Sequence, residues 1–233
     1  MHKIAISPAI LERAMRDRGG KRHVFEEIDP ARTAHVIVDM QNGFMEAGAP
    51  VEVPIARAIV DNVNAISRAV RAAGGLNVFA QFTTPADLGT WSNFYARLPA
   101  EKRQRHQEAF RPGAHGWQLW PELDVEDSDQ RLPKGRFSAF VAETCDLHEI
   151  LQARGIDTII VTGTVSNCCC ESTARDAMQL NYKVIFVADG NAALTDEDHN
   201  ATLNSLCARF ADVMTTDEVV AALHRSARSD RAA

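Results

Sequence analysis

Long apolar runs are missing from this sequence. Stretches such as VIV at 36–38 are far shorter than the roughly 20 residues that cross a bilayer. The first 30 residues carry scattered charges and no apolar stretch before a small-residue cleavage site, so we expect no secretory signal and a cytoplasmic location. A net charge of -6 and a pI near 5.7 disfavour a nucleic-acid partner. We therefore expect a soluble protein with no membrane and no nucleic-acid partner.

Cysteine is also scarce, and its spacing excludes two kinds of structural site. The chain has 5 cysteines, three of them adjacent at 168–170, and an odd number cannot form a regular disulfide framework. No C-x-x-C or Cys/His spacing indicates a structural zinc site. The sequence also lacks G-x-G-x-x-G and G-K-[ST] after its first strand-like run, which argues against a nucleotide-binding protein.

What the sequence does contain is a regular alternation of strand-like and helix-like segments in a chain long enough for one α/β domain. The clearest strands are continuous runs of β-branched residues, which is typical of a parallel sheet covered by helices on both faces. We expect strands at 34–39, 77–82, 130–134, 157–163, 183–189 and 211–216, and helices at 55–75, 142–154, 168–181, 196–209 and from 217.

Two segments fall outside this alternation. Residues 1–30 are polar and mixed, and we expect an N-terminal arm or short helix outside the core of the domain at 31–233, of the kind that often serves an oligomer contact. Residues 83–129 contain all 3 Trp and little strand pattern, so they are too long for a plain crossover. They form either a lid or pocket wall, or an excursion with a satellite core.

Chemically competent side chains follow three of the expected strands. In a parallel sheet, ligands bind beyond the carboxyl ends of the strands, and Asp39 directly follows the first apolar run. There, burial can tune the carboxyl pKa for acid/base work, although a loop-capping role is the plainer interpretation. Lys134 follows a short strand, and a single lysine is usually a solvated surface group. It becomes informative only beside a carboxylate and a thiol.

The three cysteines lie in T-V-S-N-C-C-C, residues 164–170, which we call the cysteine elbow because a strand ends and a helix begins there. A thiol at a helix N-terminus is expected to have a lowered pKa, and nearby amides can bind an oxyanion. Successive helical residues point about 100° apart, so at most one of the cysteines faces a pocket. Periodicity alone does not choose among them.

Three motifs together resemble the isochorismatase-like cysteine hydrolases over residues 33–216: D-M-Q-N-G-F, L-P-K-x-R-x-S-x-F and V-T-G-x-x-x-N-x-C-x-E-S-T-A-R-D-A. The resemblance implies a six-stranded parallel sheet of order 3-2-1-4-5-6 and an Asp-Lys-Cys triad at Asp39, Lys134 and Cys169. It also implies a non-proline cis peptide from Val165 to Ser166, with the amides of Ser166 and Cys169 as the oxyanion hole. Cys168 and Cys170 are then packing residues.

The implied reaction is cofactor-independent amide hydrolysis through a Cys169 thioester. The region after the second strand, AQFTTPADLGTW, lacks the histidines of the metal site found in nicotinamidases of this family, so we expect no metal. The motifs resemble most those of ureidoacrylate and N-carbamoyl amidohydrolases, which implies a small amide, carbamoyl or ureido substrate. Candidate substrate contacts are Gln41, Asn42, Phe44, Gln81, Phe82, Trp91, Phe94 and Tyr95.

Two further expectations concern assembly and the alternative function. We expect a homo-oligomer, either a dimer or a tetramer, that acts on a small molecule. The alternative is a thiol-based redox switch or partner-binding protein on the same fold, because vicinal cysteines invite that interpretation. A switch does not need Asp39 or Lys134, whereas the hydrolase needs both residues in contact with the thiol.

Overall fold

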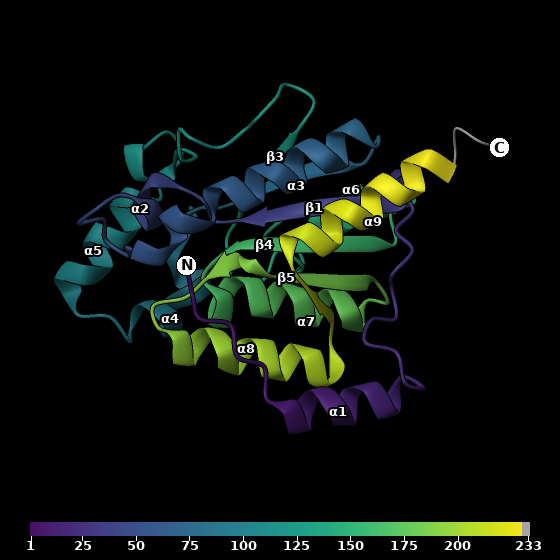
Figure 1. The fold of residues 1–233 in the computed structure, drawn as a ribbon. Coiled ribbons are helices and arrows are strands. Elements are labelled where there is room, and N and C mark those ends of the chain that lie inside the picture. The colour runs from purple at the N-terminus through teal and green to yellow at the C-terminus, as the bar shows by residue number, and fades with distance from the viewer. Residues whose placement is uncertain (230–233) are drawn as a thin grey trace.

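A computed structural model, which describes residues 1–229, contains one six-stranded sheet (Figure 1). All strand pairs are parallel and the order is β3-β2-β1-β4-β5-β6, which confirms the expected order. Because β1 lies between β2 and β4, the carboxyl ends of these three strands lie side by side. The strands are β1 (Thr33–Val38), β2 (Leu76–Phe82), β3 (Gln130–Lys134), β4 (Thr158–Thr164), β5 (Lys183–Ala192) and β6 (Asp212–Met214).

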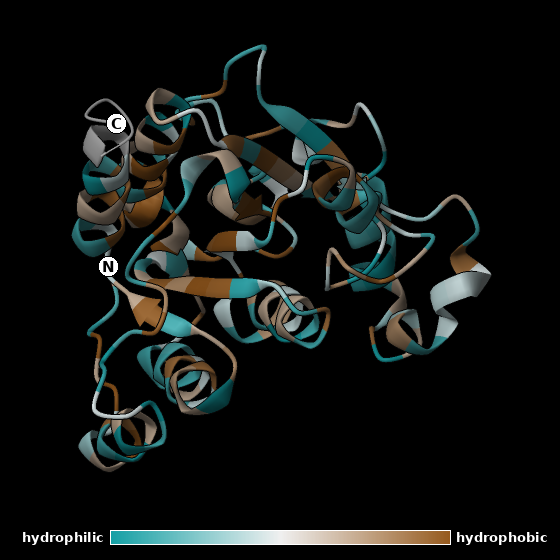
Figure 2. Ribbon diagram, turned by 90° about the vertical axis from the view of Figure 1, so that its right-hand side faces the viewer, coloured by the Kyte–Doolittle hydropathy of each residue, from teal (hydrophilic) through white to brown (hydrophobic). Residues whose placement is uncertain are grey.

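Helices cover both faces of the sheet, and this explains the continuous apolar strands. Strands β1, β2 and β4 are buried along their whole length. On one face, Ile160 and Ile185 pack against α3 (Val60–Ala72) and α9 (Thr216–Ser229). In Figure 2 the hydrophobic colour accordingly gathers on the central strands. The opposite face is covered by α6 (Leu147–Ala153), α7 (Glu171–Gln179) and α8 (Asp196–Arg209).

Some helix boundaries differ from the predictions. The helix expected at 55–75 begins as a 3-10 turn, Pro54–Ile59, before α3. The helix expected at 168–181 begins with a π-helical turn, Ser166–Cys170, before α7. Only the second half of the helix expected at 142–154 is present, as α6. Residues before it form a compact loop, because Glu143 has a φ of 65° and the Gly135 N–H donates to the Thr144 carbonyl.

The N-terminal arm packs on its own domain. Its helix α1 (Pro8–Asp17) lies beside α8 (Figure 1), and Ala14 is buried in the main core. Side-chain oxygens of Asn200 and Asn204 accept the backbone N–H groups of Ala5 and Ser7, at 2.6 and 2.7 Å. A role of this arm in a homo-oligomer stays a prediction. Residues 230–233 of the expected domain lie outside the described residues.

The 83–129 segment has a core of its own. It contains α4 (Ser92–Tyr95) and α5 (Ala100–Ala109), with 3-10 turns at Leu88–Trp91 and His115–Trp117. The segment thus has the core of the second interpretation, while its action as a lid or pocket wall stays a prediction. Neighbouring aromatic rings, with centroids 4.3–6.2 Å apart, join it to the end of β2: Phe82, Trp91, Phe94, Tyr95, His106 and Phe110.

No helix among residues 1–229 is long and apolar enough to cross a membrane.

A glycine allows β4 to approach β1 at the carboxyl edge of the sheet. Gly163 has a φ of 121°, a conformation that L side chains rarely adopt, and a Cβ at this position would overlap the carbonyl oxygen of Val38. The register between β4 and β5 also shifts between Val161 and Gly163. The close approach places the cysteine elbow beside Asp39.

We predict that Gly163→Ala lowers the free energy of unfolding by more than about 3 kcal/mol, because a strained φ and a backbone overlap add. Urea denaturation measures the change. The matched control is Gly155→Ala, since Gly155 also has a positive φ, 66°, but has nothing within 4 Å of an added Cβ. The control should lose about 1 kcal/mol. Equal losses in the two variants would contradict the argument from close approach.

Candidate active site

A buried ion pair lies at the carboxyl edge of the sheet. Asp39 directly follows β1 and Lys134 is the last residue of β3, and both side chains are 0% exposed. The Lys134 Nζ donates to Oδ2 of Asp39 at 2.8 Å and to the carbonyl of Arg136 at 3.0 Å. Oδ1 of Asp39 accepts the backbone N–H of Phe82 at 2.8 Å. Both charges are thus hydrogen-bonded as well as paired, which burial requires.

Burial and neighbouring charges set the protonation of this pair. Burial raises the pKa of Asp39, and the Lys134 charge and the hydrogen bond from the Cys169 thiol offset that rise only in part. Burial alone would lower the pKa of Lys134, but the negative charge of Asp39 and the hydrogen bond to it outweigh burial and raise this pKa above its ordinary value. Lys134 therefore stays charged, while Asp39 takes up a proton more readily than a free carboxyl group.

The cysteine elbow presents its three thiols to different surroundings. Cys169 is 3% exposed and its thiol lowers the pKa of the nearby Asp39, whereas Cys170 is fully buried in the core and Cys168 is half-buried. A hydrogen bond with Cys168, burial and the Asp39 charge together raise the pKa of Cys169 well above its ordinary value. The lowered pKa expected for a thiol at this helix N-terminus is therefore not found at Cys169, where these effects raise the pKa, but at Cys168, whose pKa is lowered by its contact with Cys169. The Cys169 thiol keeps its proton at rest.

The cis peptide lies one residue earlier than expected. It joins Thr164 to Val165, so the prediction of a cis bond from Val165 to Ser166 was wrong. Thr164 is the last residue of β4, still paired with Ala192 of β5, and the backbone changes direction directly after it. The motif identifies the elbow but does not specify at which bond the strand ends.

The amide candidates for substrate contact hold the 83–129 segment in place. The Nε2 groups of Gln41 and Gln81 both donate to the carbonyl of Trp117, at 2.8 and 2.9 Å. Gln41 also donates to the carbonyl of Phe82, and Asn42 donates to that of His115. Their nitrogen donors are thus engaged by backbone. The oxygens Oε1 of Gln41 and Oδ1 of Asn42 are buried without a hydrogen-bond partner in the protein.

The aromatic candidates lie together. Phe82 lies against the ion pair, with its ring centroid 5.2 Å from the Lys134 Nζ. Phe44 and Phe82 share one cluster with Trp91 and with Val165 of the cysteine elbow. Trp91 and Phe94 are half-buried and stack at 4.3 Å, whereas Tyr95 is buried beneath them. Trp91 is therefore the aromatic candidate that both contacts the cluster at the elbow and keeps exposed surface.

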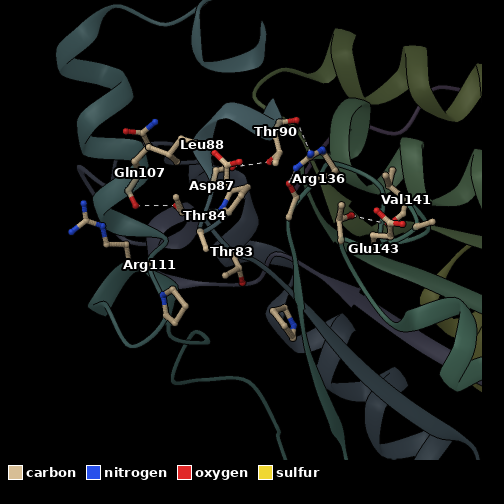
Figure 3. Close-up of a pocket in the computed structure, with 17 residues that line it drawn as sticks. Thr83, Thr84, Asp87, Leu88, Thr90, Gln107, Arg111, Arg136, Val141 and Glu143 are labelled. Atoms are coloured by element: carbon tan, nitrogen blue, oxygen red, sulfur yellow. Dashed lines mark hydrogen bonds between the residues drawn. The ribbon is translucent and has the colours of Figure 1, made fainter. Parts of the chain in front are cut away.

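A pocket of about 900 Å³ lies between the 83–129 segment and the loop after β3 (Figure 3). Asp39, Lys134 and Cys169 are not among the residues that line it, but Arg136 is. The Arg136 guanidinium donates to the Thr90 carbonyl at 2.8 Å and lies 5.1 Å from the centroid of the Trp91 ring. Arg136 thus joins the loop after β3 to the aromatic cluster, a contact that the motif did not predict.

Two buried polar residues near the site were not predicted from the sequence. His199 of α8 hydrogen-bonds to Ser166 of the elbow, and Thr202 hydrogen-bonds to Glu171. Nothing in the local pattern around 199 signals this, because the partners come together only through the fold. Within residues 1–229, no group of three or more His, Cys, Asp or Glu side chains is arranged to hold a metal ion. Metal independence stays a prediction.

Comparison with known proteins agrees with this geometry. The isochorismatase domain family matches residues 33–218. The YwoC protein of Bacillus subtilis, an isochorismatase family protein, is 34% identical over 198 residues, which cover 82% of this chain and 94% of YwoC. Ureidoacrylate amidohydrolase RutB of Klebsiella pneumoniae is 33% identical over 174 residues, which cover 69% of this chain and 73% of RutB.

A solved structure also resembles this chain. The cysteine hydrolase from Pseudomonas syringae pv. phaseolicola superposes with a TM-score of 0.77 at 30% identity, covering 85% of this chain and 95% of that one. This chain belongs to the isochorismatase family and is a hydrolase of that family.

We predict that Lys134→Met lowers the free energy of unfolding by about 3–5 kcal/mol near pH 7, because it leaves the buried Asp39 carboxylate without a cation. Loss of the lysine raises the pKa of Asp39 further above its unfolded value. The folded variant then binds a proton more tightly than the unfolded chain, so its stability should fall as pH rises and recover on acidification.

The control for this prediction is the double variant Asp39→Asn/Lys134→Met, which removes both charges. It should be more stable near pH 7 than the single variant and should lose the pH dependence. Urea denaturation between pH 5 and 8, monitored by circular dichroism, measures all three proteins. A single variant as stable as the native protein would show that the ion pair is not buried in solution.

Proposed function

We propose that this protein is a cysteine amidohydrolase that cleaves a C–N bond of a small amide, carbamoyl or ureido compound. The observation that carries the proposal is the proximity of three groups: the Cys169 thiol is close enough to Asp39 to lower the pKa of its carboxyl group, and Asp39 pairs with Lys134 at 2.8 Å. A nucleophile bonded to a base, with the base held by a third group, is the arrangement that nucleophilic catalysis requires. The similarity to RutB supports the choice of a C–N bond.

The first half of the proposed reaction forms a thioester. Asp39 takes the proton of the Cys169 thiol, and the thiolate sulfur attacks the carbonyl carbon of the substrate. The tetrahedral oxyanion accepts hydrogen bonds from backbone amides of the elbow, for which Ser166 and Cys169 stay the predicted donors. As the C–N bond breaks, Asp39 returns its proton to the departing nitrogen. The products are ammonia or an amine and an acyl-enzyme.

The second half restores the enzyme. Asp39 takes a proton from a water molecule, whose oxygen attacks the thioester carbonyl, and the thiolate of Cys169 leaves and recovers that proton. Lys134 does not exchange protons in this scheme. Its raised pKa keeps it positively charged, and it stabilises the negative charge that moves between Asp39 and the thiol. No cofactor takes part.

We assign the substrate contacts to candidate side chains that have exposed surface or a polar atom without a partner in the protein. Trp91 and Phe94 offer half-buried aromatic faces beside the cluster that contains Val165. The unpartnered oxygens of Gln41 and Asn42 are acceptors for an N–H, which a carbamoyl or ureido group supplies. We further expect the enzyme to act in the cytoplasm as a dimer or tetramer.

A redox switch is the second candidate, favoured by one observation. Cys168 is half-buried, unlike its two neighbours, and the adjacent Cys169 thiol lowers its pKa. Oxidation of Cys168 would therefore change the surroundings of the nucleophile. A switch alone does not account for the buried Asp39–Lys134 pair, so we treat it as secondary to hydrolysis.

The central prediction concerns turnover. Native enzyme should release ammonia from at least one member of a panel of small amides, N-carbamoyl amino acids and ureido acids. Cys169→Ala and Asp39→Asn should each lower kcat at least about a thousandfold while leaving binding of that substrate measurable by calorimetry. The matched control is Cys168→Ala, which removes a thiol of the same elbow and should keep kcat within about threefold.

Two outcomes would overturn this assignment. Retention of most activity by Cys169→Ala would exclude covalent catalysis by this residue, and loss of activity in Cys168→Ala alone would make Cys168 the nucleophile. An acyl adduct trapped on the Cys169 peptide by rapid quench and fragmentation mass spectrometry would support the proposal directly.

The pH profile of kcat/KM tests the resting protonation state. Because the pKa of Asp39 is raised, activity should fall on acidification at a pH above the roughly 3.9 of an ordinary aspartate. Because the pKa of Cys169 is also raised, activity should not rise with thiol ionisation near pH 8–9, roughly the ordinary thiol range. A profile that climbs through this range would show that a free thiolate, formed without Asp39, carries the reaction. Circular dichroism at each pH controls for unfolding.

A further inference from the structure

A buried histidine joins the cysteine elbow to the opposite end of the chain. His199 of α8 is 0% exposed, and its Nε2 lies 2.9 Å from the carbonyl oxygen of Ala188 in β5. A carbonyl oxygen only accepts, so Nε2 carries the ring proton and Nδ1 is an acceptor. Nδ1 lies 2.8 Å from Oγ of Ser166, whose hydroxyl therefore donates to it.

The ring of His199 is fixed by a second histidine. His2 stacks on it with centroids 4.4 Å apart and an interplanar angle of 12°. The backbone N–H of Ala193 donates to Nε2 of His2 at 2.9 Å, so Nδ1 carries the proton and donates to Asp196 at 2.7 Å. His2 is 8% exposed. Both rings are thus defined in position and in tautomer.

The protonation of His199 suits an acceptor for Ser166. Burial lowers its pKa to about 4, while the bond to Ala188 and the charge of Asp196 act in the other direction. The ring is therefore neutral around pH 7, and Nδ1 keeps its lone pair free for the Ser166 hydroxyl.

Ser166 is the first residue of the turn that carries the nucleophile. It is 0% exposed and precedes Cys169 by three residues in the π-helical turn Ser166–Cys170. Further along the same face of α8, Thr202 donates to Glu171 and Ser205 accepts from Arg175. Helix α8 thus contacts the turn Ser166–Cys170 once and the following helix α7 twice. Of these three contacts, that of His199 is the fully buried one and the one made within the turn Ser166–Cys170 itself.

We propose that His199 is a positioning residue: it fixes the turn that carries Cys169 through Ser166, and His2 of the N-terminal arm locks its ring. His199 touches neither Asp39 nor the thiol, so its effect on chemistry passes through the backbone of the elbow. The proposal rests on the proposed function for its kinetic consequence, but the placement of the thiol can be measured without a substrate.

Two substitutions at one position separate the two bonds of His199. An asparagine oxygen can take the place of Nδ1 and still accept from Ser166, whereas a glutamine nitrogen can take the place of Nε2 and still donate to Ala188. His199→Gln and Ser166→Ala should each lower kcat about ten- to a hundredfold with KM within about twofold, because a displaced nucleophile weakens attack more than binding. His199→Asn should retain most of kcat.

The double variant Ser166→Ala/His199→Gln tests whether the two residues act as one unit. If they do, its loss of kcat should equal that of the worse single variant and not the product of both. His2→Ala should lower kcat in the same direction. Its matched control is Asn204→Ala. This variant removes the hydrogen bond between α8 and the Ser7 N–H of the arm but leaves His2 and His199 unchanged.

A second readout needs no substrate. In a Cys168→Ala background, the rate of Cys169 alkylation by iodoacetamide, followed by fragmentation mass spectrometry, should change about tenfold or more in His199→Gln and Ser166→Ala but not in His199→Asn. If the native enzyme hydrolyses nothing in the panel, the proposed function fails while this measurement still decides the role of His199. Urea denaturation shows whether each variant is folded.

Three results would overturn the proposal: unchanged kcat and alkylation in Ser166→Ala, independent multiplication of the two losses in the double variant, or equal effects of His199→Asn and His199→Gln. Lower stability with unchanged kcat and alkylation in His199→Gln would make His199 a core residue only. Should His199→Gln fail to fold, Ser166→Ala, which removes one hydroxyl group, decides alone.

Discussion

The buried pairing of Asp39 with Lys134 is the interaction on which the rest of the site depends. Each charge loses several kcal/mol of hydration on burial, and a single unpaired charge could not stay there. The pair persists because backbone groups take up the remaining hydrogen bonds: the Phe82 N–H on the carboxylate and the Arg136 carbonyl on the ammonium. These partners come from the end of β2 and from the loop after β3. The charge pair and the edge of the sheet therefore hold each other in place.

Much of this arrangement could be predicted from sequence, because it depends on patterns that are local in the chain. Continuous β-branched runs indicated buried parallel strands, and the motifs around Asp39, Lys134 and Cys169 indicated which strand ends carry chemistry. Long-range pairing could not be predicted in this way. The hydrogen bond of Ser166 to His199 joins residues 33 positions apart. The raised pKa of Cys169 comes first from the adjacent Cys168 but also from burial and from the charge of Asp39, which lies more than a hundred positions away in the chain.

The 83–129 segment shows how one feature can serve two purposes. Its aromatic rings form a core that includes Phe82, the residue whose N–H binds Asp39, so the segment is fastened to the ion pair itself. Gln41 and Gln81 fasten its far end by donating to Trp117. Side chains that motif reasoning assigned to a substrate therefore hold the wall of the site, since a buried amide donor needs an acceptor whether or not a ligand is bound.

Strand β3 places Lys134 at the rim of the sheet, with β2 as its single strand neighbour among residues 1–229. An open strand edge is a template for pairing with another chain, and long exposed edges promote aggregation. This strand is short, ends in a buried lysine and carries exposed Arg131 and Pro133, the latter without an N–H to offer. The same five residues that deliver the ammonium group thus protect the molecule from intermolecular sheet extension.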